Sequence, residues 1–231
     1  MPCLARSAGD LIARMNKRSL GVLLFAAMLA GCNNVSGNAV RGSGTLKSEA
    51  RTVPAFSMVS TAGAFDIVVT QGPVTSVVIE ADDNILPEIL TTVSGTTLEI
   101  SPKSSISPSK TVVVRITHPS LLGVSIAGSG TVIAMNLDVP AFYADIAGSG
   151  SMKLAGKAGS LTINIAGSGD VSAPNLAAEK VSVGISGSGS AEVSAGSSLK
   201  ANISGSGSVV YSGEPGSVDT NVSGSGRVKR R

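Results

Sequence analysis

The sequence contains few of the side chains that enzymes commonly use for chemistry. Its 231 residues include one histidine, two cysteines and no tryptophan, and only 14% of them are charged. The histidine, His118, stands before Pro119, which is typical of a surface turn. No Gly-X-Ser-X-Gly motif supplies an activated serine, and no glycine-rich phosphate loop is complete. The sequence therefore predicts no catalytic residue, no cofactor and no metal site.

Net charge and aromatic residues are equally scarce. The formal charge is +3 and aromatic residues make up 3% of the chain. Much of the excess positive charge lies at the two termini, so no nucleic-acid partner is expected. The composition is still too apolar for intrinsic disorder, and helical periodicity is absent after the first forty residues. A β-rich fold with small side chains is therefore expected.

The first 32 residues have the pattern of a signal peptide. A short basic segment precedes an apolar run over residues 20–30, which is too short to span a bilayer. The run ends in Leu-Ala-Gly-Cys at Cys32 and resembles the bacterial lipoprotein signal. That resemblance implies cleavage before Cys32 and lipidation of its thiol; an ordinary secretory peptide with an incidental cysteine is the alternative. We expect a cell-envelope protein held to the outer membrane through Cys32, facing the periplasm or the cell surface.

These features also set the predicted domain boundaries. Met15 is a better translational start than the first methionine, and Cys3 would then not be part of the protein. Cys32 would be the only cysteine of the mature chain, so no internal disulfide is expected. Residues 33–44 are small and polar and are expected to form a flexible tether. Residues 45–231 are expected to form one domain.

The tripeptide Gly-Ser-Gly recurs six times in the second half of the chain, at intervals of 18 to 20 residues. A fixed period of this length is typical of a repeat architecture. Apolar residues stand six, four and two positions before the copies, with Thr220 the one exception, and the positions between them are small or polar. The residues two positions before the copies are Ile126, Ile146, Ile165, Ile185, Ile203 and Val222. This alternation predicts a half-buried strand before each Gly-Ser-Gly turn and another after it.

A single repeat cannot bury its own apolar side chains, whereas stacked repeats cover one another and pair their strand edges. The sequence therefore predicts an all-β fold, a right-handed parallel β-helix (β-solenoid) with about 19 residues per coil over residues 121–228. Antiparallel hairpins joined at Gly-Ser-Gly are the alternative. Outward positions should carry a polar row that includes Asp145 and Asn164. Tyr143 should also point outward, and it is the candidate aromatic contact for a ligand.

Residues 45–120 are expected to form irregular coils or a cap. The expected strands cover residues 59–60, 65–70, 74–80, 97–100 and 111–117, and a single helical turn is expected within residues 85–90. Glu80, Asp82 and Asp83 form the main acidic cluster. A cation could bind there, but an Asp-Asp-Asn turn explains the cluster better.

The same region resembles one bacterial envelope family. The segments Gly63-Ala64-Phe65-Asp66-Ile67-Val68-Val69-Thr70-Gln71-Gly72 and Val78-Ile79-Glu80-Ala81-Asp82-Asp83-Asn84, followed by Thr97-Leu98-Glu99-Ile100, carry this resemblance. The family is the putative auto-transporter adhesin, head GIN domain family, and the resemblance extends over residues 40–228. It implies a right-handed parallel β-helix, an exported or lipid-anchored protein and an adhesive role. It supplies no catalytic residues.

Two classes of function remain open at this point. The first is a non-enzymatic, lipid-anchored envelope protein that binds a glycan or a protein on its polar face or acts as a structural spacer. The second is a β-helical carbohydrate-active enzyme of the lyase or hydrolase type, for which a groove with converging Asp, Lys and Arg would be the sign. The basic ending at residues 227–231 is expected to protect the last strand from pairing with other chains; contact with lipid phosphate is the alternative.

Overall fold

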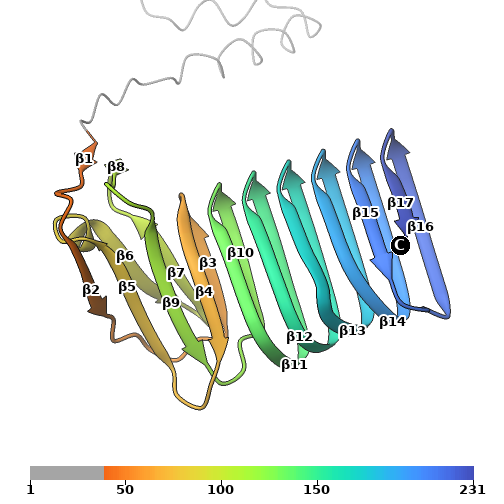
Figure 1. Ribbon diagram of the computed structural model, residues 1–231, viewed down its shortest axis with the longest axis horizontal. Helices are drawn as coiled ribbons and strands as arrows, with labels where there is room; N and C mark the ends of the chain where they lie inside the picture. Colours follow the sequence, from red (N-terminus) through yellow and green to blue (C-terminus); the bar gives the residue numbers. More distant parts are fainter. Residues whose placement is uncertain (1–38) are drawn as a thin grey trace, which may run out of the picture. The chain divides into compact units, whose positions relative to one another are not determined.

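The computed structural model describes residues 39–231, which consist almost entirely of β-strands (Figure 1). The predicted signal peptide, Met15, Cys32 and residues 33–38 of the predicted tether lie outside the described residues. The strands of the first half are β1 (Val40–Arg41), β2 (Leu46–Ala50), β3 (Met58–Ala62), β4 (Phe65–Gln71), β5 (Ser76–Asp82), β6 (Ile89–Ser94), β7 (Thr97–Pro102), β8 (Ile106–Ser107) and β9 (Val112–His118). A 3-10 turn, Leu86–Glu88, lies between β5 and β6.

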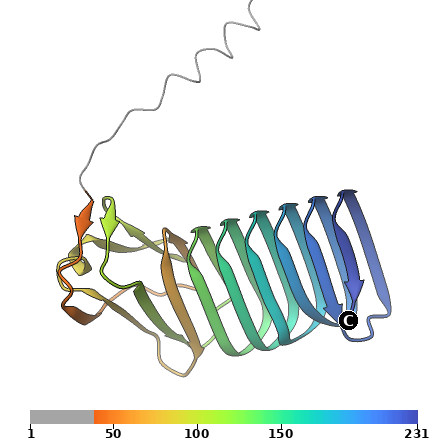
Figure 2. The same cartoon turned by 45° about the horizontal axis from the view of Figure 1, so that its top comes forward.

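The second half of the chain forms stacked parallel coils. Its strands are β10 (Gly123–Gly128), β11 (Thr131–Gly148), β12 (Ser151–Gly167), β13 (Asp170–Gly187), β14 (Ser190–Gly205), β15 (Ser208–Ser212), β16 (Ser217–Gly224) and β17 (Arg227–Arg230). Every pairing among them is parallel and joins residues one repeat apart. The β-solenoid prediction is confirmed, and the antiparallel hairpin alternative is wrong for these repeats (Figure 2).

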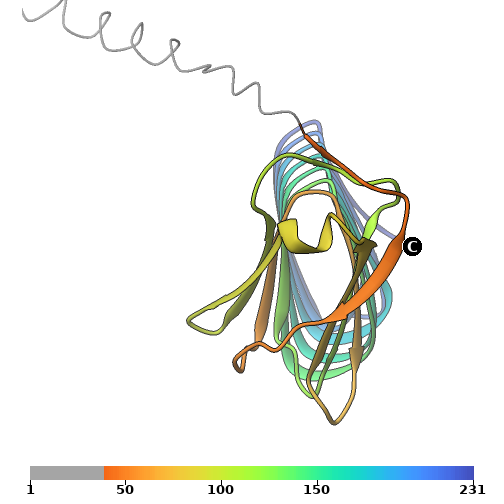
Figure 3. The same cartoon turned by 90° about the vertical axis from the view of Figure 1, so that its left-hand side faces the viewer.

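Each coil is flattened, with two long sides that meet at the Gly-Ser-Gly corner (Figure 3). We call the residues that follow a corner the first side and those that precede the next corner the second side. In three coils the bend opposite the corner also uses left-handed backbone, with φ angles of 59° at Asn136, 129° at Gly156 and 96° at Gly213, whereas the bends within β13 and β14 contain no residue of positive φ. Glycine, and asparagine to a lesser degree, tolerates this conformation. In these three coils a left-handed residue therefore marks both turns.

The first glycine of each Gly-Ser-Gly copy is required for two reasons. Gly148 has a φ of +130°, and a Cβ atom added to it would lie 2.5 Å from the carbonyl oxygen of Gly128. The backbone N–H of Ser149 donates to the same oxygen at 3.0 Å, and the N–H of Ser168 donates to the Gly148 oxygen at 2.9 Å. The corners therefore stack through direct backbone contact, which leaves no space for a side chain at the first glycine of each copy.

The core is a set of aliphatic columns inside the coils. The isoleucines that precede the corners, from Ile126 to Ile203, are at most 2% exposed, as the alternation predicts. One detail differs, because the first repeat buries Leu121 and leaves Leu122 half-buried. In the last repeat, Val218 and Val222 are 43% and 39% exposed. No further coil covers them within the residues that the structure describes.

The first half of the chain adds two coils and a cap. β3 and β4 form the coil next to β10 and β11, and β7 and β9 form the coil beyond it. The antiparallel strands β2, β5 and β6 complete this end. The 3-10 turn lies across the end of the stack (Figure 3), and Leu86 is buried there. Both the predicted cap and the predicted helical turn are therefore present.

The ordered domain begins earlier than the predicted boundary at residue 45. β1 pairs in parallel with β8. The backbone N–H of Gly44 donates to Asp82 at 2.8 Å, and that of Ser43 donates to the Asn84 side chain at 2.9 Å. Residues 40–44 of the predicted tether are therefore part of the fold.

Candidate functional site

His118 has a structural environment. Its side chain is 8% exposed and its ring centroid lies 5.0 Å from that of Phe56. Nε2 lies 2.9 Å from the Phe56 carbonyl oxygen, and Nδ1 accepts a hydrogen bond from the backbone N–H of Ser120 at 3.1 Å. Since a carbonyl only accepts and a backbone N–H only donates, these partners assign the proton to Nε2. The expectation of a surface turn residue is wrong, and both ring nitrogens are occupied by structural hydrogen bonds.

The acidic cluster is a turn that holds the start of the domain. Asp82 is fully buried and accepts hydrogen bonds from the backbone N–H groups of Gly44 and Ser109, each at 2.8 Å, and from the Ser109 hydroxyl. Asp83 accepts from the Ser43 hydroxyl at 2.6 Å. The hydroxyl of Ser109 lowers the pKa of Asp82, and the hydroxyl of Ser43 lowers the pKa of Asp83, because each hydrogen bond favours the ionised carboxylate.

This arrangement agrees with the predicted Asp-Asp-Asn turn. Asn84 completes it, because its side-chain N–H donates to the Arg41 carbonyl at 2.7 Å. Among residues 39–231, no group of three or more His, Cys, Asp or Glu side chains is arranged to hold a metal ion.

The outer surface of the second side carries an in-register row of mostly polar residues. One residue of each coil lies beside its equivalent in the next coil, and the members are Glu99, Ser60, Ser125, Asp145, Asn164, Gly184, Asn202 and Asn221. The side-chain N–H of Asn164 donates to Asp145 Oδ1 at 2.7 Å. Adjacent strands lie about 4.8 Å apart, so the row presents polar groups at a regular spacing. We call this row and the outward residues beside it the polar face.

Tyr143 lies on the polar face, two residues before Asp145 on β11, and is 45% exposed. A depression of about 360 Å³ lies next to it on this surface. Its lining includes Asp145, Asn164, Asn202 and the backbone of Gly184. The absence of a side chain at Gly184 interrupts the row between the two asparagines. The outward position of Tyr143 matches the prediction, and its contact with a ligand stays a prediction.

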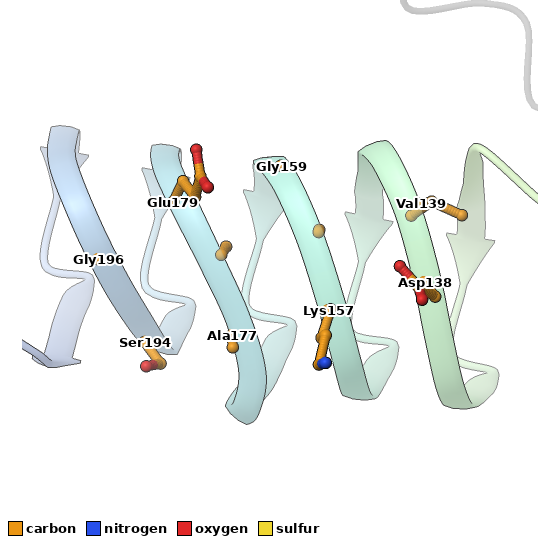
Figure 4. Close-up of a pocket in the computed structure, with 10 residues that line it drawn as sticks. Asp138, Val139, Lys157, Gly159, Ala177, Glu179, Ser194 and Gly196 are labelled. Atoms are coloured by element: carbon orange, nitrogen blue, oxygen red, sulfur yellow. The ribbon is translucent and has the colours of Figure 1, made fainter.

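A second depression, of about 390 Å³, crosses four coils near the bend opposite the corners (Figure 4). Asp138 and Lys157 are neighbours in the parallel register, and Glu179 lines the same groove. Its floor consists of small residues, among them Gly159 and Ala177. Sequence reasoning missed this groove, because the connections between the repeats differ in length and their side chains could not be aligned in advance.

The third depression, about 480 Å³, lies on the first side near the C-terminal end. Apart from Lys229, its charged residues contact one another, Glu214 or a neutral group. Arg231 pairs with Glu192 at 2.5 Å, and the Ser190 hydroxyl donates to Asp170. Arg230, from the same basic ending, pairs with Glu214 at 3.1 Å. These contacts fasten the basic ending onto the preceding coils.

The predicted sign of an enzyme was a groove in which Asp, Lys and Arg converge. The groove of Figure 4 and the C-terminal depression both contain acidic and basic side chains. In the C-terminal depression Glu192 forms an ion pair with Arg231. The polar row has two carboxylates, Glu99 and Asp145, and Ser60 and Ser125 lie between them. Three strand spacings separate them by about 14 Å, which is farther apart than the two carboxylates that glycoside hydrolysis commonly uses. This geometry does not favour the enzymatic alternative.

The structure has no helix within residues 39–231 that is long and apolar enough to cross a membrane. Comparison with curated proteins found no match.

Comparison with protein families and solved structures gives a consistent result. A family model described as putative auto-transporter adhesin, head GIN domain, matches residues 55–215. A putative adhesin from Bacteroides fragilis is similar in structure, with a TM-score of 0.70 and 25% identity over 84% of this chain and 100% of that chain.

Two proteins from Parabacteroides distasonis are also similar over 84% of this chain and 100% of theirs. One is described as a putative lipid binding protein, with a TM-score of 0.58 and 22% identity. The other is described as a putative adhesin, with a TM-score of 0.55 and 23% identity. At these identities the two likenesses show a shared fold.

Proposed function

Because the chain belongs to the putative auto-transporter adhesin, head GIN domain family, we propose that it is a non-enzymatic binding module of the bacterial cell envelope, anchored by a lipid on Cys32. The family and the B. fragilis neighbour support an adhesin-like role and a surface or envelope location. The lipid anchor rests on the sequence pattern that ends at Cys32.

The observation that carries this proposal is the in-register polar face. Stacked coils fix each outward side chain relative to the next, because strands β11 to β13 are hydrogen-bonded on both edges within the stack. A surface of this kind loses little conformational entropy when a ligand binds. It therefore suits repeated contacts with an extended surface more than the closed geometry that catalysis requires.

Lipid anchoring is tested by metabolic labelling with radioactive palmitate. The wild-type chain should incorporate label and fractionate with membranes. Cys32→Ala should lose the label and most of the membrane association, because no acyl chain remains to hold the protein. Cys3→Ala is the matched control and should be labelled normally. Equal labelling of wild type and Cys32→Ala would exclude the anchor.

Adhesion is tested separately in cells. A strain that expresses the protein should be retained on immobilised envelope and host-matrix material more than a strain that lacks the gene. A strain with Cys32→Ala should behave like the deletion strain. Equal retention of wild-type and deletion strains would exclude the adhesive role while leaving the anchor intact.

A further inference from the structure

Three candidate surfaces take no part in the hydrogen bonds that hold the fold together. They are the groove near the opposite bend, the exposed apolar residues of the last coil and the polar face. The groove has a small-residue floor and charges of both signs, which identify no ligand class. The exposed apolar residues of the last coil have no feature that identifies what would cover them. The polar face combines an exposed aromatic ring, a fixed amide–carboxylate pair and a depression.

The amide–carboxylate pair has a defined orientation. Asn164 donates one hydrogen to Asp145 Oδ1 at 2.7 Å, which fixes the amide group. Its carbonyl oxygen and second N–H hydrogen, together with Asp145 Oδ2, make no hydrogen bond within residues 39–231. Asp145 has no ion-pair partner in the same part of the chain. One fixed pair therefore presents both a donor and acceptors to solvent.

Tyr143 provides an apolar surface beside this pair. Its neighbours in the parallel register are Gly123 and Thr162, both small. A Cβ atom on Gly123 would lie 2.9 Å from Met58 Cε and 2.8 Å from Tyr143 Cβ, so the methionine methyl reaches over the glycine toward the tyrosine. Tyr143 and Met58 therefore form a small apolar platform at one end of the polar groups.

The face is also suited to an extended ligand. The row nearer the corner consists only of small exposed residues, which are Ala127, Ala147, Ala166, Ser186 and Ser204. Polar groups recur from coil to coil beside it. A ligand that runs along the solenoid axis can therefore lie close to the surface and meet one polar group for each coil that it crosses.

These features distinguish between classes of ligand. A peptide that docks on a β-sheet uses a free strand edge, whereas the backbone groups of β11 to β13 are already paired on both sides. An anionic polymer would be repelled near Tyr143 by the carboxylate of Asp145, which has no ion-pair partner within residues 39–231, since Lys200, which lies in the row of Tyr143, is three coils away. An uncharged sugar has an apolar ring face and hydroxyl groups that both donate and accept, which complement an aromatic platform beside an amide–carboxylate pair.

We propose that the polar face binds an uncharged, linear oligosaccharide along the solenoid axis. One sugar ring packs on Tyr143, and its hydroxyl groups bond to Asp145 and Asn164. The depression at Gly184 accommodates a further ring. This assignment rests on the proposed function as a binding module and names the class of its ligand.

The test uses the full chain in detergent micelles on an array of uncharged, linear oligosaccharides that includes cellohexaose, maltohexaose and chitohexaose. At least one should be retained. Tyr143→Ala and Asp145→Asn should each weaken its binding about tenfold or more, as expected for the loss of a stacked ring or a charged hydrogen bond. Lys153→Ala, an exposed change on the first side, is the matched control and should bind like wild type. All three variants should melt like wild type.

Two results would overturn the assignment. One is the failure of every uncharged oligosaccharide on the array to bind. The other is equal binding by wild type and both polar-face variants. If either occurs while anchored cells still adhere through a Cys32-dependent protein, the ligand class is wrong and the binding-module function stands. If adhesion is absent as well, both proposals fail.

Discussion

At the scale of single residues, the corner glycines decide whether coils can stack. Gly148 needs a left-handed backbone and contacts the carbonyl of Gly128 directly. Gly184 lacks a side chain for a different reason. It lies on the polar face without a left-handed backbone, and an added Cβ atom would lie 3.1 Å from the side-chain oxygen of Asn164. Gly148 is therefore required for the coils to stack, whereas Gly184 only shapes the outer surface.

Gly148→Ala should lower the free energy of unfolding by about 3 kcal/mol, because it adds backbone strain and overlap with fixed backbone atoms. Gly184→Ala is the matched control and should cost less than about 1 kcal/mol, because its close neighbour is the end of the Asn164 side chain, which needs to shift by only a few tenths of an ångström. Urea denaturation followed by circular dichroism measures both changes. Equal midpoints for the two variants would show that the corner tolerates a side chain.

The hydrogen bonds of Asp82 make the attachment of the first residues of the domain dependent on pH. Its folded pKa is lowered, first by the Ser109 hydroxyl, so the ionised form is favoured in the native state. The stability it contributes is fully present above the unfolded pKa of about 3.9 and is lost as pH falls through the lower folded value. The protection of the Gly44 and Ser109 amides from hydrogen exchange, measured relative to the intrinsic exchange rate at each pH, should therefore fall below about pH 4.

Asp82→Asn should raise exchange at these two amides already at neutral pH and remove most of this acid dependence. Asp138→Asn is the matched control, because Asp138 is exposed and its carboxylate holds no such segment. It should leave exchange at both amides unchanged. Unchanged protection of Gly44 in Asp82→Asn would show that the β1–β8 pairing alone holds this segment.

At the scale of elements, the repeats could be predicted from the sequence because local and global signals agree. The alternation that ends in Ile146 or Ile165 assigns side chains to the inside, and the corner glycines fix the register. The first half was less predictable. β7 and β9 come later in the chain than β3 and β4 but lie farther from β10 and β11, so coil order and chain order differ. Gly63, with a φ of +125°, occupies the corner position there without a Gly-Ser-Gly motif.

The candidate binding surface was likewise predictable only in part. The outward position of Tyr143 and the row through Asp145 followed from the alternation, since neighbours in a parallel stack share a register. The groove near the opposite bend did not, because Gly159 and Glu179 come from connections of unequal length. The role of His118 was also missed. Its partner, the Phe56 carbonyl, is 62 residues away in sequence and no local pattern brings them together.

Ile165→Asp tests the predicted inside of the stack. Ile165 is 2% exposed, and an unpaired buried carboxylate costs several kcal/mol, a large share of the stability of a domain. The variant should lose its cooperative melting transition. Ala166→Asp, one residue along and exposed, should melt within a few degrees of wild type. A normal melting curve for Ile165→Asp would place this side chain outside the core.

At the scale of the whole molecule, the solenoid is a one-dimensional stack in which each repeat contacts its two neighbours. Stability in such a protein is approximately a sum of repeat and interface contributions. The interface between β12 and β14 would resemble the natural ones, because Leu161 and Ile165 would face Leu199 and Ile203 if β13 were absent. The equivalence of these positions follows from their shared register with β13.

Deletion of residues 168–187 removes one coil and rejoins Gly167 to Ser188, which restores a Gly-Ser-Gly corner. The shortened protein should fold cooperatively, with a smaller urea dependence of the unfolding free energy because less surface is exposed on unfolding. Deletion of residues 168–177 is the control. It removes the first side of the coil and leaves the second side connected directly to a corner, so the following strands can no longer continue around the core. This variant should fail to fold. If the full-coil deletion also failed to fold, coils would not be interchangeable, and the stack would depend on contacts specific to β13.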